Sequence, residues 1–321
     1  MKKYNFTKCS WRNRIFLFFL LIIPGLDVSG QSLTPLVVTS SGGYLQGWGT
    51  TLSSTVGEVA ITTLLGTENI LTQGFQQPPV HPYELDIKVF LEGPALNGEM
   101  YSYLNLAGLL PLAQPYLGSP WYYPGIESVG IIPNDDVIDW VLIEIRETSG
   151  GASTATSDKI IMRKAALLLK DGSVVDLDGI SKPVAMLDFN DDLYCVVRHR
   201  NHVGVMSASP VNQIPGNILQ AWFYDNASSA YGGILAHKEV EPGLWAMVAA
   251  DGDGSGQINN QDKLEVWAPQ AGSWGYYSGD FNMDMNVSNV DKNDYWIPNS
   301  GLGSQVPETT PPGGFKTMIP D

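Results

Sequence analysis

The chain has 321 residues, of which 44% are hydrophobic, so it can bury a substantial core. Asp and Glu number 33 against 18 Lys and Arg, a formal net charge of −15. This balance argues against nucleic-acid binding, which needs clustered basic side chains. The 34 glycines and 21 prolines favour a β-rich protein with many turns.

Residues 1–30 have the pattern of a signal peptide. Five basic residues between Lys2 and Arg14 precede an apolar run from Ile15 to Pro24. The run is too short to span a bilayer comfortably, and the small residues Val28-Ser29-Gly30 offer a cleavage site. A membrane anchor is the alternative. We expect a secreted or cell-surface protein once this segment has been removed.

The two cysteines separate if this segment is cleaved. Cys9 leaves with the signal peptide, and Cys195 remains alone on an apolar run. An internal disulfide is then excluded, so stability must come from core burial and from bound ligands. We expect Cys195 to be a buried small hydrophobe.

Residues 31–79 are predicted to form a short β leader segment. β-Branched residues are dense in Val56–Thr63, and Pro78-Pro79 ends the segment. Gly57-Glu58-Val59, followed by Leu71–Phe75 and Gln77-Pro78, resembles a leader segment common in secreted proteins of the Bacteroidetes type. The resemblance implies placement at the cell surface or outside the cell, and it implies no chemistry.

Residues 84–245 carry the pattern of an antiparallel β-sandwich. Leu85–Leu91 and Asp139–Glu147 alternate, so each is predicted to be a strand with one face toward water. Strands at this spacing with little helix between them favour a sandwich. Further strands are expected at Ala165–Leu169, Val174–Leu177, Tyr194–Arg200 and Val203–Ala208.

Four segments of this region resemble a recurrent part of large bacterial surface proteins that are described as hemagglutinin-like. They are Leu85–Pro94, Asp139–Leu142, Asp171–Gly179 and Val197–Ser207. The resemblance would cover about residues 84–300. It implies adhesion, and the family offers no established catalytic residues.

Two polar clusters on the predicted strands could carry chemistry. If alternation continues through His199 and His202, the two rings point to different faces, which does not suit a shared metal. We expect a polar strand end with ion pairs; metal binding or acid–base catalysis is the alternative. Glu144 and Arg146 are expected to form a salt bridge on one face. A glycosidase would need a second carboxyl that the sequence does not place.

Other polar and aromatic residues have simpler explanations. Four aromatic residues stand in a loop rich in Pro and Gly, where they either pack over an open end of the sandwich or stack on sugars; they are Tyr116, Trp121, Tyr122 and Tyr123. Asp176 and Asp178 suit a hairpin turn, with a third calcium site as the alternative. The sequence lacks a nucleophile elbow, a zinc helix and a phosphate loop, so a non-enzymatic role is favoured while an enzyme stays open.

The clearest functional pattern is an acidic twelve-residue loop, Asp251–Asp262. Oxygen-bearing side chains fall at positions 1, 3, 5 and 12, namely Asp251, Asp253, Ser255 and Asp262. Calcium prefers six to eight oxygens, and a short loop surrounds it only if the chain turns sharply midway. Gly256 permits that turn. Gln257 would offer its backbone carbonyl, and Ile258 would point inward.

A second loop, Asp280–Asp291, repeats the scheme in the same register. Its candidate ligands are Asp280, Asn282, Asp284, Asn286 and Asp291, with Val287 in the inward position. Met285 occupies the place that favours glycine, so this second site is predicted to be strained or weaker. Short helices are expected at Lys263–Trp267 and Lys292–Trp296, and Ile258 and Val287 are expected to pair with each other.

The paired loops resemble a dockerin-type repeat, a calcium loop plus helix that is similar to half an EF-hand. The resemblance implies two Ca²⁺ ions and a cohesin-like partner. It implies calcium binding better than cohesin binding, because cohesin contact usually uses small hydroxyl residues at the helix starts. This chain has Asn260-Gln261 and Asn289-Val290 there.

The whole chain is therefore predicted to be mainly β, with a small C-terminal calcium module. The expected parts are a signal peptide (1–30), a β leader (31–79), a sandwich domain (84–245), a dockerin-like module (246–300) and a Pro/Gly-rich tail (301–321). We expect a calcium-binding surface or adhesion protein whose module provides docking or rigidity, with a cohesin-like or glycan partner. A component of polysaccharide degradation is the alternative.

Overall fold

The structure, a computed structural model, describes residues 41–47, 50–56, 63–65, 70–72 and 81–309. The predicted signal peptide, the segment 73–80 and the tail beyond residue 309 lie outside the described residues. The chain divides into two compact units, Met1–Gln77 and Pro78–Asp321. Antiparallel pairs make up what is described of the first unit: β1 (Ser41–Gly47) with β2 (Thr50–Val56), and β3 (Thr63–Leu65) with β4 (Ile70–Thr72).

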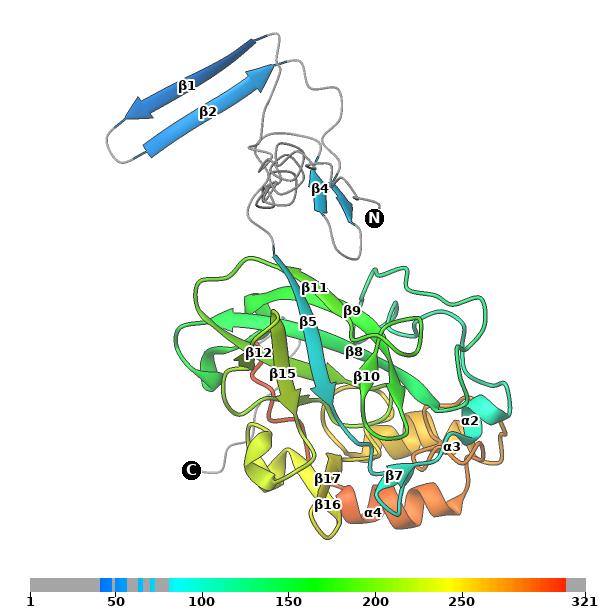
Figure 1. The fold of residues 1–321 in the computed structure, drawn as a ribbon. Helices are drawn as coiled ribbons and strands as arrows, with labels where there is room; N and C mark the ends of the chain where they lie inside the picture. The colour runs from blue at the N-terminus through cyan, green and yellow to red at the C-terminus, as the bar shows by residue number, and fades with distance from the viewer. Residues whose placement is uncertain (1–40, 48–49, 57–62, 66–69, 73–80, 310–321) are drawn as a thin grey trace, which may run out of the picture. The chain divides into compact units, whose positions relative to one another are not determined.

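The second unit is built around two β-sheets (Figure 1). The larger sheet consists of β8 (Val137–Thr148), β9 (Ile160–Leu169), β10 (Val174–Val175), β12 (Asp192–Arg198) and β13 (Val205–Met206). Its order is β10-β9-β8-β12-β13, and every pair is antiparallel. The prediction of a mainly β protein with antiparallel sheets is confirmed.

The smaller sheet departs from a purely antiparallel arrangement. It consists of β5 (His81–Lys88), β11 (Val184–Leu187), β14 (Asn212–Ile214) and β15 (Ile218–Trp222). The order is β11-β5-β15-β14, and β15 runs parallel to β5. The parallel pairing is possible because the chain returns to β5 only after a long crossover through the larger sheet, whereas a short hairpin forces antiparallel strands.

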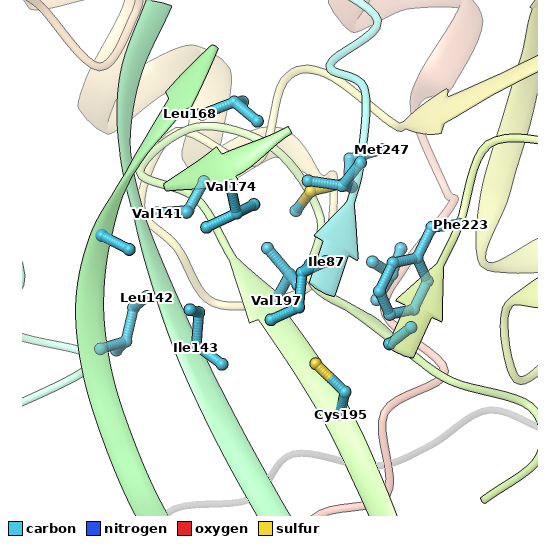
Figure 2. Close-up of a cluster of buried hydrophobic side chains, with 14 of the residues drawn as sticks. Ile87, Val141, Leu142, Ile143, Leu168, Val174, Cys195, Val197, Phe223 and Met247 are labelled. Atoms are coloured by element: carbon cyan, nitrogen blue, oxygen red, sulfur yellow. The ribbon is translucent and has the colours of Figure 1, made fainter. Parts of the chain in front are cut away.

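One hydrophobic core lies between the two sheets. In Figure 2, Ile87 of β5 points toward Val197 of β12, and Val141 and Ile143 of β8 belong to the same cluster. Cys195 lies in this cluster with 1% of its surface exposed, which confirms the expected buried thiol. Burial of these side chains away from water is the main stabilising contribution to the fold.

The prediction of one wet face is confirmed for the part of Leu85–Leu91 that lies in β5, whereas Val89–Leu91 are all buried, and it is wrong for β8. On β5, Leu85 and Ile87 are buried while Glu84 is exposed. On β8, both faces are buried, because other segments cover the face that points away from the core. Val306, for example, packs with Tyr194, Val196 and Met206 on that outer face.

Short elements complete the second unit and connect the sheets. They are β6 (Ala95–Leu96), β7 (Glu99–Met100), α2 (Tyr103–Leu106), η1 (Ala152–Thr154), η2 (Ser157–Lys159), η3 (Ala227–Ser229), η4 (Gly233–Leu235), β16 (His237–Glu241) and β17 (Leu244–Met247). The helices of the described part are too short or too polar to cross a membrane.

The two acidic loops are each followed by a helical segment. A π-helical turn, η5 (Asp262–Trp267), continues into α3 (Ala268–Gln270), and η6 (Asp291–Trp296) continues into α4 (Ile297–Asn299). Pro269 and Pro298 lie in these segments and have no backbone N–H for an α-helical hydrogen bond, which is consistent with the wider π turn before each of them. Both helices lie where the sequence predicted them, but each begins one residue earlier and ends three residues later, at Gln270 and Asn299.

Candidate metal centre

The two acidic loops belong to two copies of one sequence repeat, 29 residues apart. That offset relates Asp251 to Asp280 and Asp262 to Asp291. The repeat continues past the loops, through Lys263 and Lys292, Trp267 and Trp296, Pro269 and Pro298, and Gly272 and Gly301. The sequence reasoning found the loops and missed this longer similarity, although the Trp-x-Pro spacing after each loop was a visible signal.

The first loop brings three carboxylates together. One oxygen each from Asp251, Asp253 and Asp262 lies within 4.8 Å of the others. Oxygens that share one Ca²⁺ at 2.3–2.6 Å are separated by at most about 5 Å, so this group fits the ion. Backbone N–H groups fix the outer two: Gly256 donates to Asp251 at 3.0 Å, and Asn259 donates to Asp262 at 2.7 Å.

The remaining predicted ligands of the first loop follow the same turn. Gly256 has a φ of +81°, the left-handed conformation that the sequence predicted for position 6. Ser255 and Gln257 are half-buried, and the Ser255 hydroxyl donates to the Gln257 carbonyl at 3.4 Å. Ile258 is 1% exposed, so it points inward as expected.

The second loop repeats these hydrogen bonds. Met285 N–H donates to Asp280 at 2.9 Å, as Gly256 does to Asp251 in the first loop. Asp291 accepts from the N–H groups of Phe281 and Ser288, both at 2.7 Å. The backbones of the two loops therefore hold their first and last carboxylates in the same way.

The ligand set of the second loop is weaker at position 3. Asn282 replaces an aspartate there, and its amide donates to Asp284 at 3.0 Å. Within the described residues, no second group of three carboxylates reaches the spacing of the first. Asn286 is exposed, and its side-chain amide donates to the Asp284 carbonyl at 3.2 Å, so only its backbone carbonyl suits a ligand role.

Met285 has a φ of +78°, which confirms a strained second loop. Met283 has a φ of +61°, a second strained position that the sequence reasoning missed. The matching residues of the first loop are Gly254 and Gly256, which adopt this conformation without a Cβ clash. The two loops thus have nearly the same backbone path at different conformational cost.

The loop carboxylates are buried close to one another. Asp251 is 2% exposed, and Asp262, Asp280 and Asp291 are 0% exposed. Burial raises the pKa of Asp262 to about 6, and burial raises the pKa of Asp280 to about 7 although Arg200 opposes the shift. Burial and the neighbouring Asp262 and Asp253 carboxylates raise the pKa of Asp251 as well. A divalent cation is the group that would offset this repulsion.

The expected pairing between Ile258 and Val287 is wrong. Ile258 N–H donates to Leu302 at 2.9 Å, and Val287 N–H donates to Ser273 at 3.0 Å. Each loop therefore pairs with the segment that follows the helix of the other loop. The pairing is crossed because each helix packs against the loop of the other repeat, where Trp267 and Trp296 make their hydrogen bonds.

The helices repeat this crossed arrangement through their tryptophans. Trp267 Nε1 donates to the Ser288 carbonyl at 2.7 Å, and Trp296 Nε1 donates to the Asn259 carbonyl at 2.8 Å. Lys263 lies over the Trp296 ring at 4.4 Å, and Lys292 lies over the Trp267 ring at 4.8 Å. Each helix holds the loop of the other repeat in place.

Buried polar contacts attach the paired loops to the sandwich. Asn201 Nδ2 donates to the Asp280 carbonyl at 2.7 Å, and the Tyr101 hydroxyl donates to the Asn282 carbonyl at 2.5 Å. At the other end, Asn299 Nδ2 donates to Glu92 at 2.7 Å. The second repeat is thus fixed to the rest of the second unit through its loop and through the end of its helix.

The ion pairs expected at the end of β12 are present, since Arg200 binds Asp139 at 2.8 Å, but the opposite faces predicted for His199 and His202 are wrong. Strand β12 ends at Arg198, so alternation does not extend to His199 and His202, and their Nδ1 atoms lie 3.1 Å apart. His202 Nε2 accepts from Gly93 N–H at 3.1 Å, and His199 Nε2 contacts Asp139 at 3.3 Å. Burial lowers both pKa values, so the pair is a neutral, hydrogen-bonded part of the interior.

The other candidate groups have structural roles. Glu144 and Arg146 form the expected salt bridge at 2.6 Å. Asp176 pairs with Lys164 at 2.7 Å, and the Asp178 carboxylate accepts from the Ser181 hydroxyl within its turn. Of the four loop aromatics, Tyr116 and Tyr123 are buried, Tyr122 is exposed and Trp121 is half-buried. Sugar stacking is therefore wrong for Tyr116 and Tyr123.

No family model, curated protein or solved structure matches this chain. The exposed helix-start residues Asn260, Gln261, Asn289 and Val290 are the positions that the dockerin resemblance assigns to a partner.

Proposed function

We propose that this is a secreted calcium-binding surface or adhesion protein whose C-terminal, dockerin-like pair of loops binds two Ca²⁺ ions. The observation that supports the proposal most strongly is the group of Asp251, Asp253 and Asp262, with carboxylate oxygens within 4.8 Å. Carboxylates buried this closely destabilise a fold unless a cation joins them.

The role of calcium that the contacts favour is rigidity. Asn201 and Tyr101 of the sandwich unit bind backbone carbonyls of the second loop, and Asn299 binds Glu92. An ion that orders the loops would therefore order the surface of the sandwich around them. Binding to the folded state alone also raises stability in proportion to the logarithm of calcium concentration.

Calorimetric calcium titration tests the proposal directly. We expect at most two sites with dissociation constants on the order of 10⁻⁵–10⁻³ M, the range of sensor and extracellular sites. Asp251→Ala should abolish the tighter site, and Asp280→Ala should abolish the weaker, strained one. Asp171→Ala, at an exposed turn, is the matched control and should leave both sites unchanged. Calcium binding that survives in the Asp251→Ala, Asp280→Ala double variant would refute the assignment.

A second candidate function is a tethered component of polysaccharide degradation. The exposed helix starts at Asn260 and Asn289 favour it, because they leave a docking surface free for a cohesin-like partner. Calcium-dependent adhesion to cells or glycans without turnover would favour the first function. Release of reducing sugar from mixed glycans would favour the second.

A further inference from the structure

A cavity of about 310 Å³ lies on the outer face of the larger sheet. Its walls come from the sheet, from the loop that carries Trp121, from the first acidic loop at Gly254–Gln257 and from the C-terminal segment at Glu308. Binding sites for small molecules begin at about 300 Å³. The cavity therefore has room for one small ligand.

The charges that line this cavity do not balance. Glu144 contacts three arginines: Arg146 at 2.6 Å, Arg163 at 3.4 Å and Arg198 at 3.5 Å. The only other carboxylate among the lining residues is that of Glu308. Three cations face two anions, so a ligand with a single negative charge would neutralise the site.

The arginines also hold hydrogen-bond donors without acceptors. Arg146 is 0% exposed and lines the cavity, and its Nε has no hydrogen-bond partner within the described chain. The same is true of Arg163 Nε, although Glu144 lies 3.4 Å away as an ion pair. The Arg146 side chain is closed to a ligand, so Arg163, with 22% of its side chain exposed, is the arginine that offers donors to the cavity.

The protein itself shows that a carboxylate fits among these arginines. Glu308 binds Arg146 at 3.1 Å and forms a short ion pair with Arg198. The guanidinium group presents a planar set of donors that matches a carboxylate. The chemistry of the site is therefore suited to a third carboxylate, beside Glu144 and Glu308, at the Arg163 side.

Trp121 gives the cavity an aromatic wall next to the arginines. Its backbone carbonyl accepts from Arg163 Nη2 at 2.9 Å. The first acidic loop packs against the ring, since a Cβ added to Gly254 would lie 2.6 Å from it. Aromatic rings offer the C–H face of a sugar an apolar surface, and the neighbouring arginine offers a partner for an acidic group.

We propose that this cavity binds a uronic acid residue, a sugar ring that carries one carboxylate. Arg163 binds the carboxylate, Arg146 beneath it adds positive charge without contacting the ligand, and Trp121 contacts the ring. Calcium strengthens this binding, because Gly254–Gln257 form a wall of the cavity and the ion reduces the loop's negative charge from three to one. This calcium dependence rests on the proposed function; the cavity does not.

The test is titration of the calcium-loaded protein with D-galacturonate, with D-galactose as the neutral match and acetate as the carboxylate without a ring. Galacturonate should bind about tenfold tighter than either probe, the effect of one charged hydrogen-bonded contact. Arg163→Gln, which keeps hydrogen bonding and removes the charge, should lose about that factor. Lys164→Gln is the matched control, because Lys164 pairs with Asp176 outside the cavity. This variant should bind galacturonate with unchanged affinity.

Trp121→Leu provides a second variant that keeps every charge, and it should weaken galacturonate without affecting acetate. Equal affinity for galacturonate and galactose, or full affinity in Arg163→Gln, would overturn the proposal. If acetate binds as tightly as galacturonate, the sugar ring contributes nothing, and the assignment of a sugar as the ligand is overturned. Titration in chelator separates the two proposals: uronate binding by a protein that binds no calcium supports the cavity and rejects the calcium function. Calcium binding without uronate binding rejects the cavity alone.

Discussion

Single residues decide how costly each acidic loop is to form. Positions 4 and 6 require positive φ in both loops, and glycine supplies it only in the first. The sequence was sufficient to predict the strain at Met285, because position 6 of such a loop is recognisable. The sequence was insufficient for Met283, since the requirement for positive φ at position 4 depends on the path of the backbone around it.

Gly256→Ala tests this conformational requirement. Gly256 has a φ of +81°, and an added Cβ would meet only the Ser304 Cβ at 3.4 Å. Backbone strain, more than steric overlap, should therefore cause the loss of stability in Gly256→Ala. We expect a loss of at least about 1 kcal/mol in the free energy of unfolding, measured by urea denaturation in calcium. Gly118→Ala, with ordinary φ and no atom within 4 Å of the new Cβ, is the control and should change stability by less than about 0.5 kcal/mol. Equal losses in both variants would contradict the strain argument.

The histidine pair shows where residue-level reasoning failed. Alternation assigns His199 and His202 to opposite faces only while the strand continues, and β12 ends one residue before His199. The position of a strand end depends on what packs beyond it, here Asp139 and Gly93 from distant parts of the chain. Local pattern alone does not contain that information.

At the scale of elements, the two repeats are interlocked rather than adjacent. The sequence predicted both loops and both helices, because the ligand spacing and the apolar positions are local. It did not predict the crossed pairing of Ile258 with Leu302 and of Val287 with Ser273, since that pairing is set by how the two halves close on each other.

Trp267→Leu tests the crossed contacts. The substitution removes the hydrogen bond to Ser288 and the contact with Lys292, and we expect a loss of about 2 kcal/mol in unfolding free energy. Calcium affinity should fall more at the second loop than at the first, because Ser288 N–H donates to Asp291. Trp274→Leu is the control, since that side chain is 57% exposed. A larger effect on the first loop would contradict the crossed arrangement.

For the whole molecule, the outer face of the larger sheet holds a layer of buried charge. Glu144 and Arg146 on β8 are buried there. The alternation of β8 predicted its two faces and the Glu144–Arg146 bridge. It did not predict that both faces are covered, because the covering segment, which includes Val306 and Glu308, lies far along the chain.

Two buried carboxylates predict acid sensitivity of the fold. Burial opposes their ionisation, but Arg200 holds the pKa of Asp139 at about 2, and Arg198 and Arg146 hold the pKa of Glu144 at about 2. Because these folded-state values lie below those of the unfolded chain, their stabilisation is present above about pH 4 and is lost as the pH falls toward 2. Together they contribute roughly 6 kcal/mol.

Urea denaturation in chelator between pH 4.5 and 2 measures this loss. The midpoint should fall steadily over that range in the wild type. Asp139→Asn should lower stability at pH 4.5 and flatten the dependence, because one of the two groups no longer takes up a proton. A wild-type midpoint that stays constant from pH 4.5 to 2 would contradict the ion-pair assignment.

The crossed pairing also constrains the order in which the chain can fold during synthesis. The Gly256 carbonyl accepts from Ser304 N–H at 2.7 Å, and Arg146 of the larger sheet forms an ion pair with Glu308. The contacts of the first acidic loop and of the arginines on the outer face of the larger sheet are incomplete until residues 301–309 have left the ribosome. The sandwich therefore emerges with its charged face open, and residues 301–309 cover that face only after both repeats have been made.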